Sequence, residues 1–237
     1  MQATLIIAKR QLRSYFSGPV AYIVTCLFLL LIGVFFWPDF FLVKRATVRD
    51  LFQVVSLLTV FAAPAMTMGS LAEERGRGTL ELLITMPIRD WQVIVGKFFA
   101  AFSLFAIMLA VTFVYPLSVS TLGNLDWGPV FTGYLALALQ GAAMLSIGLL
   151  ASSWTENQLI AFFIGIALCF AFWFIDRFVP FLPRGAASVF EWLSINYHFR
   201  SMIRGVIDTR NVLYFLSLIG LALALAFHSL ERRRWSA

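Results

Sequence analysis

Charge is scarce in this 237-residue chain, of which 13% is charged and 61% is hydrophobic. Soluble domains carry about 25% charged residues, and the mean hydropathy of +0.87 also argues against a water-soluble core. Cysteine is nearly absent. Cys26 and Cys169 both fall in apolar runs and have no Cys-x-x-Cys partner, so the sequence supports neither a disulfide framework nor a zinc site.

Motifs for nucleotide chemistry are also missing. Gly96-Lys97-Phe98 lacks the hydroxyl residue that ends a phosphate-binding loop, and Trp91 stands where that loop needs its first glycine. An intramembrane glutamate protease would need arginine at position 78, which is glycine. His198 and His228 have no obvious partner in the sequence. We therefore expect no catalytic residue, no metal site and no cofactor bound by this chain.

Long apolar stretches are what the chain does contain. Six stretches of 19 to 29 residues carry no charge: 14–38, 51–72, 98–125, 127–155, 157–175 and 211–230. About 20 apolar residues suffice for a helix to cross the hydrocarbon core of a bilayer. Elements of a soluble core need neither this length nor six repetitions. The predicted fold class is an all-α membrane protein with six transmembrane helices, forming one domain over 1–237.

The polar groups inside these stretches are hydroxyls and amides, which can hydrogen-bond between helices. Ion-coupled transporters typically place ionisable residues deep within their spans, and the six stretches offer none. Energy for any transport is therefore expected to come from elsewhere. Small residues supply faces for close helix packing, for which a second protomer is one candidate: Gly141, Gly148, Ala161 and Gly165.

Residues 1–16 are predicted to form a basic amphipathic helix. One face carries Met1, Leu5, Ala8, Leu12, Tyr15 and Phe16, the other carries Lys9, Arg10 and Arg13, and Ile6 and Ile7 do not fit the pattern. Such a helix lies in the membrane interface with its basic groups toward lipid phosphates. A charged flank of the first span is the alternative, although Ser17-Gly18-Pro19 favours two separate helices.

The segment 73–88 is a polar interruption between two membrane-length runs. Glu73 and Glu74 precede a short predicted helix over 79–86, ended by Pro87, in which only Glu81 and Thr85 are polar. So apolar a helix is poorly solvated unless it docks onto protein or lipid. Acidic residues favour a helix N-terminus and are suited to basic groups on a partner. The alternative is a helix packed against its own spans.

Residues 177–210 mix aromatic and charged side chains with Pro180 and Pro183. No charge-free stretch there is long enough to span, so we expect one or two short interfacial helices. Six spans place both termini on one side. That side would hold ten Lys and Arg residues against eight on the other, a small excess that favours cytoplasmic termini.

Several motifs resemble those of type-2 ABC exporter permeases. They are Glu73-Glu74-Arg75, Gly78-Thr79-Leu80-Glu81-Leu82-Leu83 and Pro87-Ile88, continuing through Trp91 and Gly96-Lys97-Phe98. The strongest resemblance is to the GldF-like, gliding-motility-type branch. It rests on 9–16 with Pro19, Thr155-Glu156-Asn157-Gln158, Tyr197-His198-Phe199 and Arg204-Gly205-Val206-Ile207-Asp208. The resemblance covers nearly the whole chain.

The resemblance implies roles for three segments. Residues 1–16 would be an interfacial helix, with Lys9, Arg10, Arg13, Tyr15 and Phe16. The 73–88 loop would be a coupling helix touching a separate ATPase, through Glu73, Glu74, Arg75, Thr79, Leu80, Glu81, Leu82, Leu83, Thr85 and Pro87. The 177–210 segment would form outer gate helices, with Tyr197, His198, Phe199, Arg204 and Asp208.

The resemblance also implies partners and a location. ATP and Mg would bind the partner ABC ATPase. The other partners would be a second permease copy or paralogue, an auxiliary outer-face protein and membrane lipids, with no nucleic acid. The chain would span a bacterial inner membrane with cytoplasmic termini. We therefore expect the transmembrane, non-enzymatic subunit of an ATP-driven exporter of unnamed substrate. The alternative is a non-transporting transducer or scaffold, driven by the same ATPase and acting on envelope partners.

Overall fold

The computed structural model describes residues 2–43, 47–76, 78, 90–181 and 183–234, and all regular secondary structure in these ranges is helical. Six helical segments are long and apolar enough to cross a membrane. These segments are Ala21–Pro38, Arg49–Gly76, Asp90–Leu122, Trp127–Trp154, Gln158–Arg177 and Thr209–Glu231. The predicted fold class is therefore confirmed.

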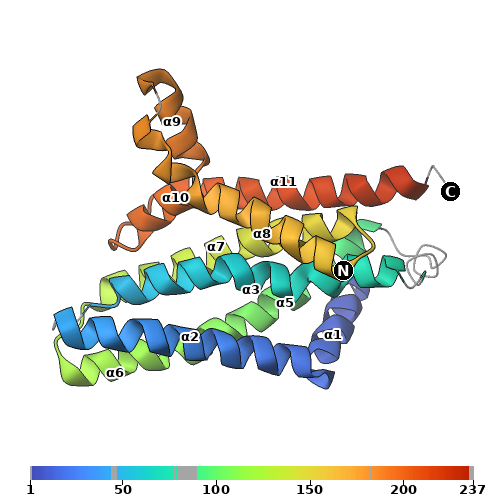
Figure 1. The fold of residues 1–237 in the computed structure, drawn as a ribbon. Helices are drawn as coiled ribbons and strands as arrows, with labels where there is room; N and C mark the ends of the chain where they lie inside the picture. Colours follow the sequence, from blue (N-terminus) through green and yellow to red (C-terminus); the bar gives the residue numbers. More distant parts are fainter. Residues whose placement is uncertain (1, 44–46, 77, 79–89, 182, 235–237) are drawn as a thin grey trace.

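The six spans run alternately up and down one bundle (Figure 1). They are built from α2 (Pro19–Val43), α3 (Arg49–Gly76), α5 (Asp90–Thr112) with α6 (Val114–Leu122), α7 (Trp127–Trp154), α8 (Gln158–Phe174) and α11 (Thr209–Arg234). We call the bundle end that holds α1 (Gln2–Ser17), the last turn of α3 and the last turn of α11 the terminal end. The opposite end holds α6, η1 (Ile175–Arg177), η2 (Val179–Phe181), α9 (Arg184–Leu193) and α10 (Ile195–Met202).

Helix α7 lies at the centre of the bundle. Its most apolar stretch is 83% buried inside the protein. The corresponding share is 17% for the span that contains α8 and 28% for the span formed by α11. Polar contacts fasten it to its neighbours, because Gln140 Nε2 donates to Ser56 Oγ of α3 at 2.7 Å. The same Ser56 hydroxyl accepts from Trp173 Nε1 of α8 at 3.1 Å. The outer helices α2, α8 and α11 leave apolar faces exposed, as lipid contact requires.

The small residues of α7 and α8 pack inside this chain. A Cβ at Gly141 would lie 2.0 Å from Phe105 Cε1, and one at Gly148 would lie 2.2 Å from Thr67 Oγ1. At Gly165 a Cβ would lie 2.9 Å from Pro64 Cβ, and Ala161 is fully buried. The idea that these residues face a second protomer is therefore wrong, because the chain's own helices already fill the space.

Two span boundaries differ from the expected ones. The stretch 98–125 is not one unbroken helix: α5 begins earlier, at Asp90, and ends at Thr112, and α6 begins at Val114, so Pro116 sits in the first turn of a new helix. Proline is tolerated there because the first N–H groups of a helix have no intrahelical acceptor. The first span likewise continues through Pro38 to Val43.

Helix α1 is separate from α2, as the Ser17-Gly18-Pro19 break predicted. Its expected apolar face is divided, because Ala8, Leu12 and Tyr15 are at least partly buried while Leu5 and Phe16 are exposed. Ile7, an exception in the predicted pattern, lies against α5, where a Cβ on Gly96 would come within 2.9 Å of it. A membrane-interface position for α1 stays a prediction. Lys9, Arg10 and Arg13 are exposed, as that position requires.

Candidate functional site

A buried ion pair joins α3 and α5 at the terminal end. Lys97 is 2% exposed, and its Nζ lies 2.6 Å from Glu74 Oε2. The same ammonium donates to the backbone carbonyl of Ser70. The expectation that the spans contain no buried charge is therefore wrong. Because α5 begins at Asp90, Lys97 is two turns inside the helix and not on its flank. Lys97 was expected to lie outside the third span because the charge-free stretch begins at Phe98, one residue later.

Glu73, Glu74 and Arg75 form the last turn of α3 and do not begin a new helix. The helix runs through Gly76, and Gly78 follows at φ +69°, a conformation typical of a glycine that ends a helix. Arg75 Nη1 donates to the carbonyl of Ser153 in α7 at 2.6 Å. Glu74 and Arg75 thus bond within the chain, and Glu73 lies at the surface. Their contact with a separate ATPase stays a prediction.

Ser152 of α7 also holds this end of α3. Its hydroxyl donates to the carbonyl of Met68 at 2.9 Å and accepts from the backbone N–H groups of Leu71 and Ala72 at 3.1 and 3.0 Å. A hydroxyl placed among the backbone groups of a neighbouring helix can bend that helix. The contact lies just before Glu73, so α7 holds the last turns of α3 in place.

Tyr15 attaches α1 to the same region. Its hydroxyl donates to the carbonyl of Met66 at 3.1 Å and lies 3.1 Å from Ser70 Oγ. Burial raises the pKa of Tyr15 above its ordinary value of 10.0, so the hydroxyl keeps its proton at neutral pH and can donate. We call Tyr15, Ser70, Glu74, Lys97 and Ser152 the anchor cluster. It joins α1, α3, α5 and α7 where the 77–89 connection begins and ends.

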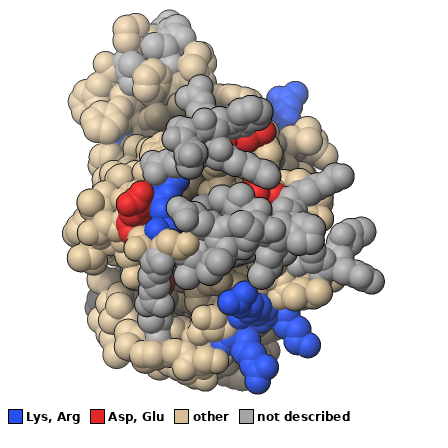
Figure 2. All heavy atoms as spheres, turned by 90° about the vertical axis from the view of Figure 1, so that its right-hand side faces the viewer, with Lys and Arg blue, Asp and Glu red and all other residues tan. Residues whose placement is uncertain are grey.

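The remaining predicted coupling residues lie outside the described residues: Thr79, Leu80, Glu81, Leu82, Leu83, Thr85 and Pro87. Figure 2 looks onto the terminal end, where acidic and basic side chains are visible among neutral ones. In the described part of the chain, no group of three His, Cys, Asp or Glu side chains is placed to hold a metal ion. The anchor cluster thus forms a mechanical connection between α1, α3, α5 and α7.

Replacing Ser152 by alanine is expected to destabilise the protein by about 1 to 3 kcal/mol, because backbone groups of α3 lose a buried partner. Thermal unfolding of the detergent-solubilised chain measures the change. Ser153→Ala is the matched control, since its hydroxyl is also buried but bonds to Leu150 of its own helix at 2.7 Å. Equal melting temperatures for the two variants would contradict this role of Ser152.

At the opposite end, the predicted gate residues fall into different environments. Phe199 is fully buried in the core, while Tyr197 is half exposed and Arg204 is exposed. Asp208 precedes α11, and its Oδ1 accepts from the backbone N–H of Arg210 at 2.9 Å. Four of the five predicted residues (Tyr197, His198, Arg204 and Asp208) line one pocket. A gating role stays a prediction.

The two histidines do have partners, contrary to the expectation from sequence. His198 Nδ1 lies 2.7 Å from Asn211 Oδ1, and Nε2 lies 2.9 Å from the carbonyl oxygen of Trp192. Its ring stacks on Tyr214 with centroids 4.0 Å apart. His228 lies 3.7 Å from Glu231, one turn further along α11. Only the fold could reveal the partners of His198, since they come from two other helices, α9 and α11.

Sequence reasoning also missed Asp176 as a site residue. Its Oδ2 accepts from Asn196 Nδ2 at 3.0 Å and lies 3.5 Å from Arg200 Nη1. These contacts tie the end of the fifth span to α10. A carboxylate directly after a charge-free stretch is an available signal, but it is equally typical of an ordinary solvated span end.

The bundle, its six membrane-length helices and its anchored helix ends define a multi-pass helical membrane protein. Residues 5–235 match the family described as ABC-2 family transporter protein, and the chain belongs to that family.

Two curated relatives are similar to part of the chain. "Probable multidrug ABC transporter permease YbhR" of Escherichia coli strain K12 is 28% identical over 110 residues, which cover 46% of this chain and 29% of the relative. The protein of the same name from Escherichia coli O157:H7 gives the same values. The matched segment thus spans less than a third of these relatives. The gliding-motility-type branch stays a prediction.

Proposed function

We propose that this chain is the membrane-spanning subunit of an ABC exporter, and that the 77–89 connection is the coupling helix through which a separate ATPase drives it. One observation carries the proposal. The helix ends that flank the connection are joined directly, because Lys97 of α5 pairs with Glu74 of α3 at 2.6 Å. A force on the connection would therefore move α3 and α5 together.

The anchor cluster would spread that movement through the bundle. Ser152 and the Arg75–Ser153 contact link α3 to the central helix α7, and Tyr15 links α3 to α1. ATP and Mg would bind the ATPase partner, whose closure would push on residues 79–86. Both termini would be cytoplasmic in a bacterial inner membrane, and a second permease chain would complete the transporter.

Cross-linking tests the coupling helix. With the exposed Cys26 replaced by serine, a cysteine at Glu81 or Thr85 is expected to cross-link to the co-expressed ATPase. The matched control is Asn124→Cys, an exposed position at the opposite end of the bundle, which is expected to give no product. Absence of cross-links from both loop positions, with no ATPase in the purified complex, would refute the proposal.

Activity tests the energy source and the outcome of the cycle. Vanadate-sensitive ATP hydrolysis is expected only when the chain is purified with its ATPase. Flux of candidate substrates into inverted vesicles then separates an exporter from a transducer that moves an envelope partner. Hydrolysis without flux of any candidate, together with movement of such a partner, would favour the transducer.

A further inference from the structure

An exposed apolar surface lies at the opposite end of the bundle, on residues 178–181 and 183–193. We call this segment, which contains η2 and α9, the arm. Figure 1 shows α9 running across the direction of the spans and pointing away from them, and the same projection is visible at the top of Figure 2. Helix α9 packs chiefly on η1, η2 and α10. The arm thus extends to one side of the bundle.

The apolar side chains of the arm point outward. Phe181 is 86% exposed, and Val189 and Trp192 are 63% and 61% exposed. Within α9, Val189, Trp192 and Leu193 share one face, because residues three and four positions apart are neighbours on a helix. Glu191 lies on the other side and is half-buried. The exposed apolar side chains, which we call the arm face, are Phe178, Phe181, Val189, Trp192 and Leu193.

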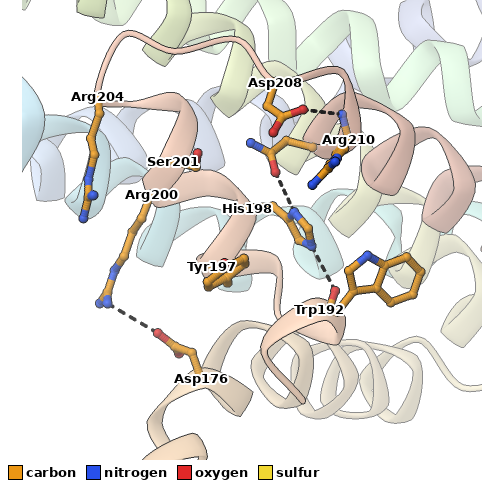
Figure 3. A pocket seen from close by; sticks show the side chains of 10 residues that line it. Asp176, Trp192, Tyr197, His198, Arg200, Ser201, Arg204, Asp208 and Arg210 are labelled. Carbon is orange, nitrogen blue, oxygen red and sulfur yellow. Dashed lines mark hydrogen bonds and ion pairs between the residues drawn. The ribbon is translucent and has the colours of Figure 1, made fainter. Parts of the chain in front are cut away.

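Hydrogen bonds fix the arm to the bundle at its C-terminal end. His198 Nε2 of α10 lies 2.9 Å from the carbonyl oxygen of Trp192, as a dashed line in Figure 3 marks. The hydroxyl of Tyr214 in α11 donates to the carbonyl of Leu193 at 2.6 Å. The Tyr214 ring also meets that of Trp192 edge-on, with centroids 5.8 Å apart. These contacts hold the end of α9 in place and leave the arm face uncovered.

The arm lies at the level of the membrane surface. It directly follows the fifth span, Gln158–Arg177, and the sixth span begins only at Thr209. A helix that runs across the spans at this level lies along the plane of the membrane. Amphipathic helices in this position bury their apolar face at the boundary between headgroups and acyl chains. Tryptophan is enriched at the same boundary.

The arm face continues the apolar surface of α8. The exposed ring of Phe170 stacks on that of Phe174 with centroids 5.1 Å apart, and Phe174 meets Phe178 edge-on at 5.7 Å. The span that contains α8 is only 17% buried by its own chain, so its outer side chains are open to the acyl chains around it. Lipid that covers α8 therefore reaches Phe178 and Phe181 without a polar interruption.

A second copy of the chain is the other candidate to cover the arm face. Five side chains at these exposures offer roughly 500 to 600 Å², less than the ~800 Å² that each partner contributes to a stable protein interface. A patch of this size is nevertheless too large to be left to water without a partner. A lipid leaflet can cover it without any complementary protein surface. The area and the continuity with α8 both favour lipid.

We propose that the arm inserts its apolar face into the lipid leaflet at the opposite end of the bundle, with acyl chains as its ligand. Phe181 and Val189 contact the acyl chains, and Ser188 lies on the side of α9 that faces water. Through the contacts of His198 and Tyr214, the inserted arm attaches α10 and α11 to that leaflet.

Site-directed fluorescence tests the arm in the complex of the full chain and its ATPase, reconstituted in nanodiscs of phosphatidylethanolamine and phosphatidylglycerol. With the exposed Cys26 replaced by serine, Phe181→Cys and Val189→Cys each carry the dye NBD. Lipids with nitroxide-labelled acyl chains are expected to quench both dyes at least about twofold, and iodide in the buffer is expected to quench them little, because interfacial helices reach about 5 to 10 Å into the headgroup and acyl boundary.

The matched control is Ser188→Cys, an exposed position beside Val189 that is not part of the arm face. Its dye should be quenched by iodide and little by the labelled acyl chains. Iodide access at Phe181 and Val189 equal to that at Ser188 overturns the proposal. Protection from iodide without quenching by the acyl chains also overturns it, and disulfides between two Val189→Cys chains would then assign the arm face to a second copy. No nucleotide is added, so none of these outcomes depends on the coupling helix.

Discussion

Replacing Lys97 by methionine is expected to lower the free energy of unfolding by about 3 kcal/mol, because removal of one partner from a buried ion pair leaves the other charge uncompensated. The ammonium is 2% exposed and holds both Glu74 and the carbonyl of Ser70. The loss corresponds to a fall of roughly 6 to 12 °C in melting temperature for a chain of this size. Thermal unfolding of the detergent-solubilised protein measures it.

Three further variants distinguish the loss of the Glu74–Lys97 ion pair from a general effect of changing charge. Lys9→Met removes an exposed lysine of α1 and should change the melting temperature little. Glu74→Leu/Lys97→Met should recover part of the loss, because no charge is left unpaired. The exchange Glu74→Lys/Lys97→Glu should fail, since a carboxylate at position 97 would face the Ser70 carbonyl. Restoration of full stability by this exchange would contradict the described geometry.

Replacing Gly141 by alanine is expected to destabilise the bundle by about 1 to 3 kcal/mol, the usual cost of overpacking a filled core. The new Cβ would lie 2.0 Å from Phe105 Cε1, and the Phe105 ring is fully buried and has little room to move. Helices α5 and α7 would have to separate. Unfolding in detergent, together with ATPase activity of the assembled complex, reports both the stability and the coupling.

Gly220→Ala is the matched control for this prediction. A Cβ at Gly220 of α11 meets nothing within 4 Å, so alanine should be neutral or slightly stabilising through its higher helix propensity. Phe105→Leu should partly rescue Gly141→Ala by giving the methyl group space. If both glycine variants unfold at the same temperature, the close approach of α5 and α7 at Gly141 is wrong.

The sequence predicted the spans well and the polar contacts poorly, for a physical reason. Span length is set by bilayer thickness, so runs of apolar residues locate the helices without knowledge of their neighbours. The break at Ser17-Gly18-Pro19 was also predictable, because glycine and proline act through local backbone geometry. The exact ends were less so, since Pro38 and Pro116 lie inside helical segments.

Contacts between helices depend on positions far apart in the chain. Lys97 appeared to flank a span because nothing in the sequence indicates that Glu74 lies beside it, 23 positions earlier. His198 appeared to lack a partner because Asn211 and Trp192 come from other helices. The small residues of α7 were correctly expected to allow close packing, but their neighbour proved to be this chain. A pattern of small residues in a helix indicates which face packs closely. It does not indicate whether the neighbouring helix belongs to the same chain or to a second one.

The central position of α7 has a consequence for biosynthesis. Spans emerge in chain order, so α7 enters the bilayer when α3 and α5 are already present and α8 and α11 are not. Gln140, fully buried in the finished bundle, can reach Ser56 of α3 at once and need not face lipid. The hydroxyl of Ser56 then receives Trp173 when α8 follows. The first four spans therefore can assemble as a unit in the membrane, and the last two enclose it as they leave the ribosome.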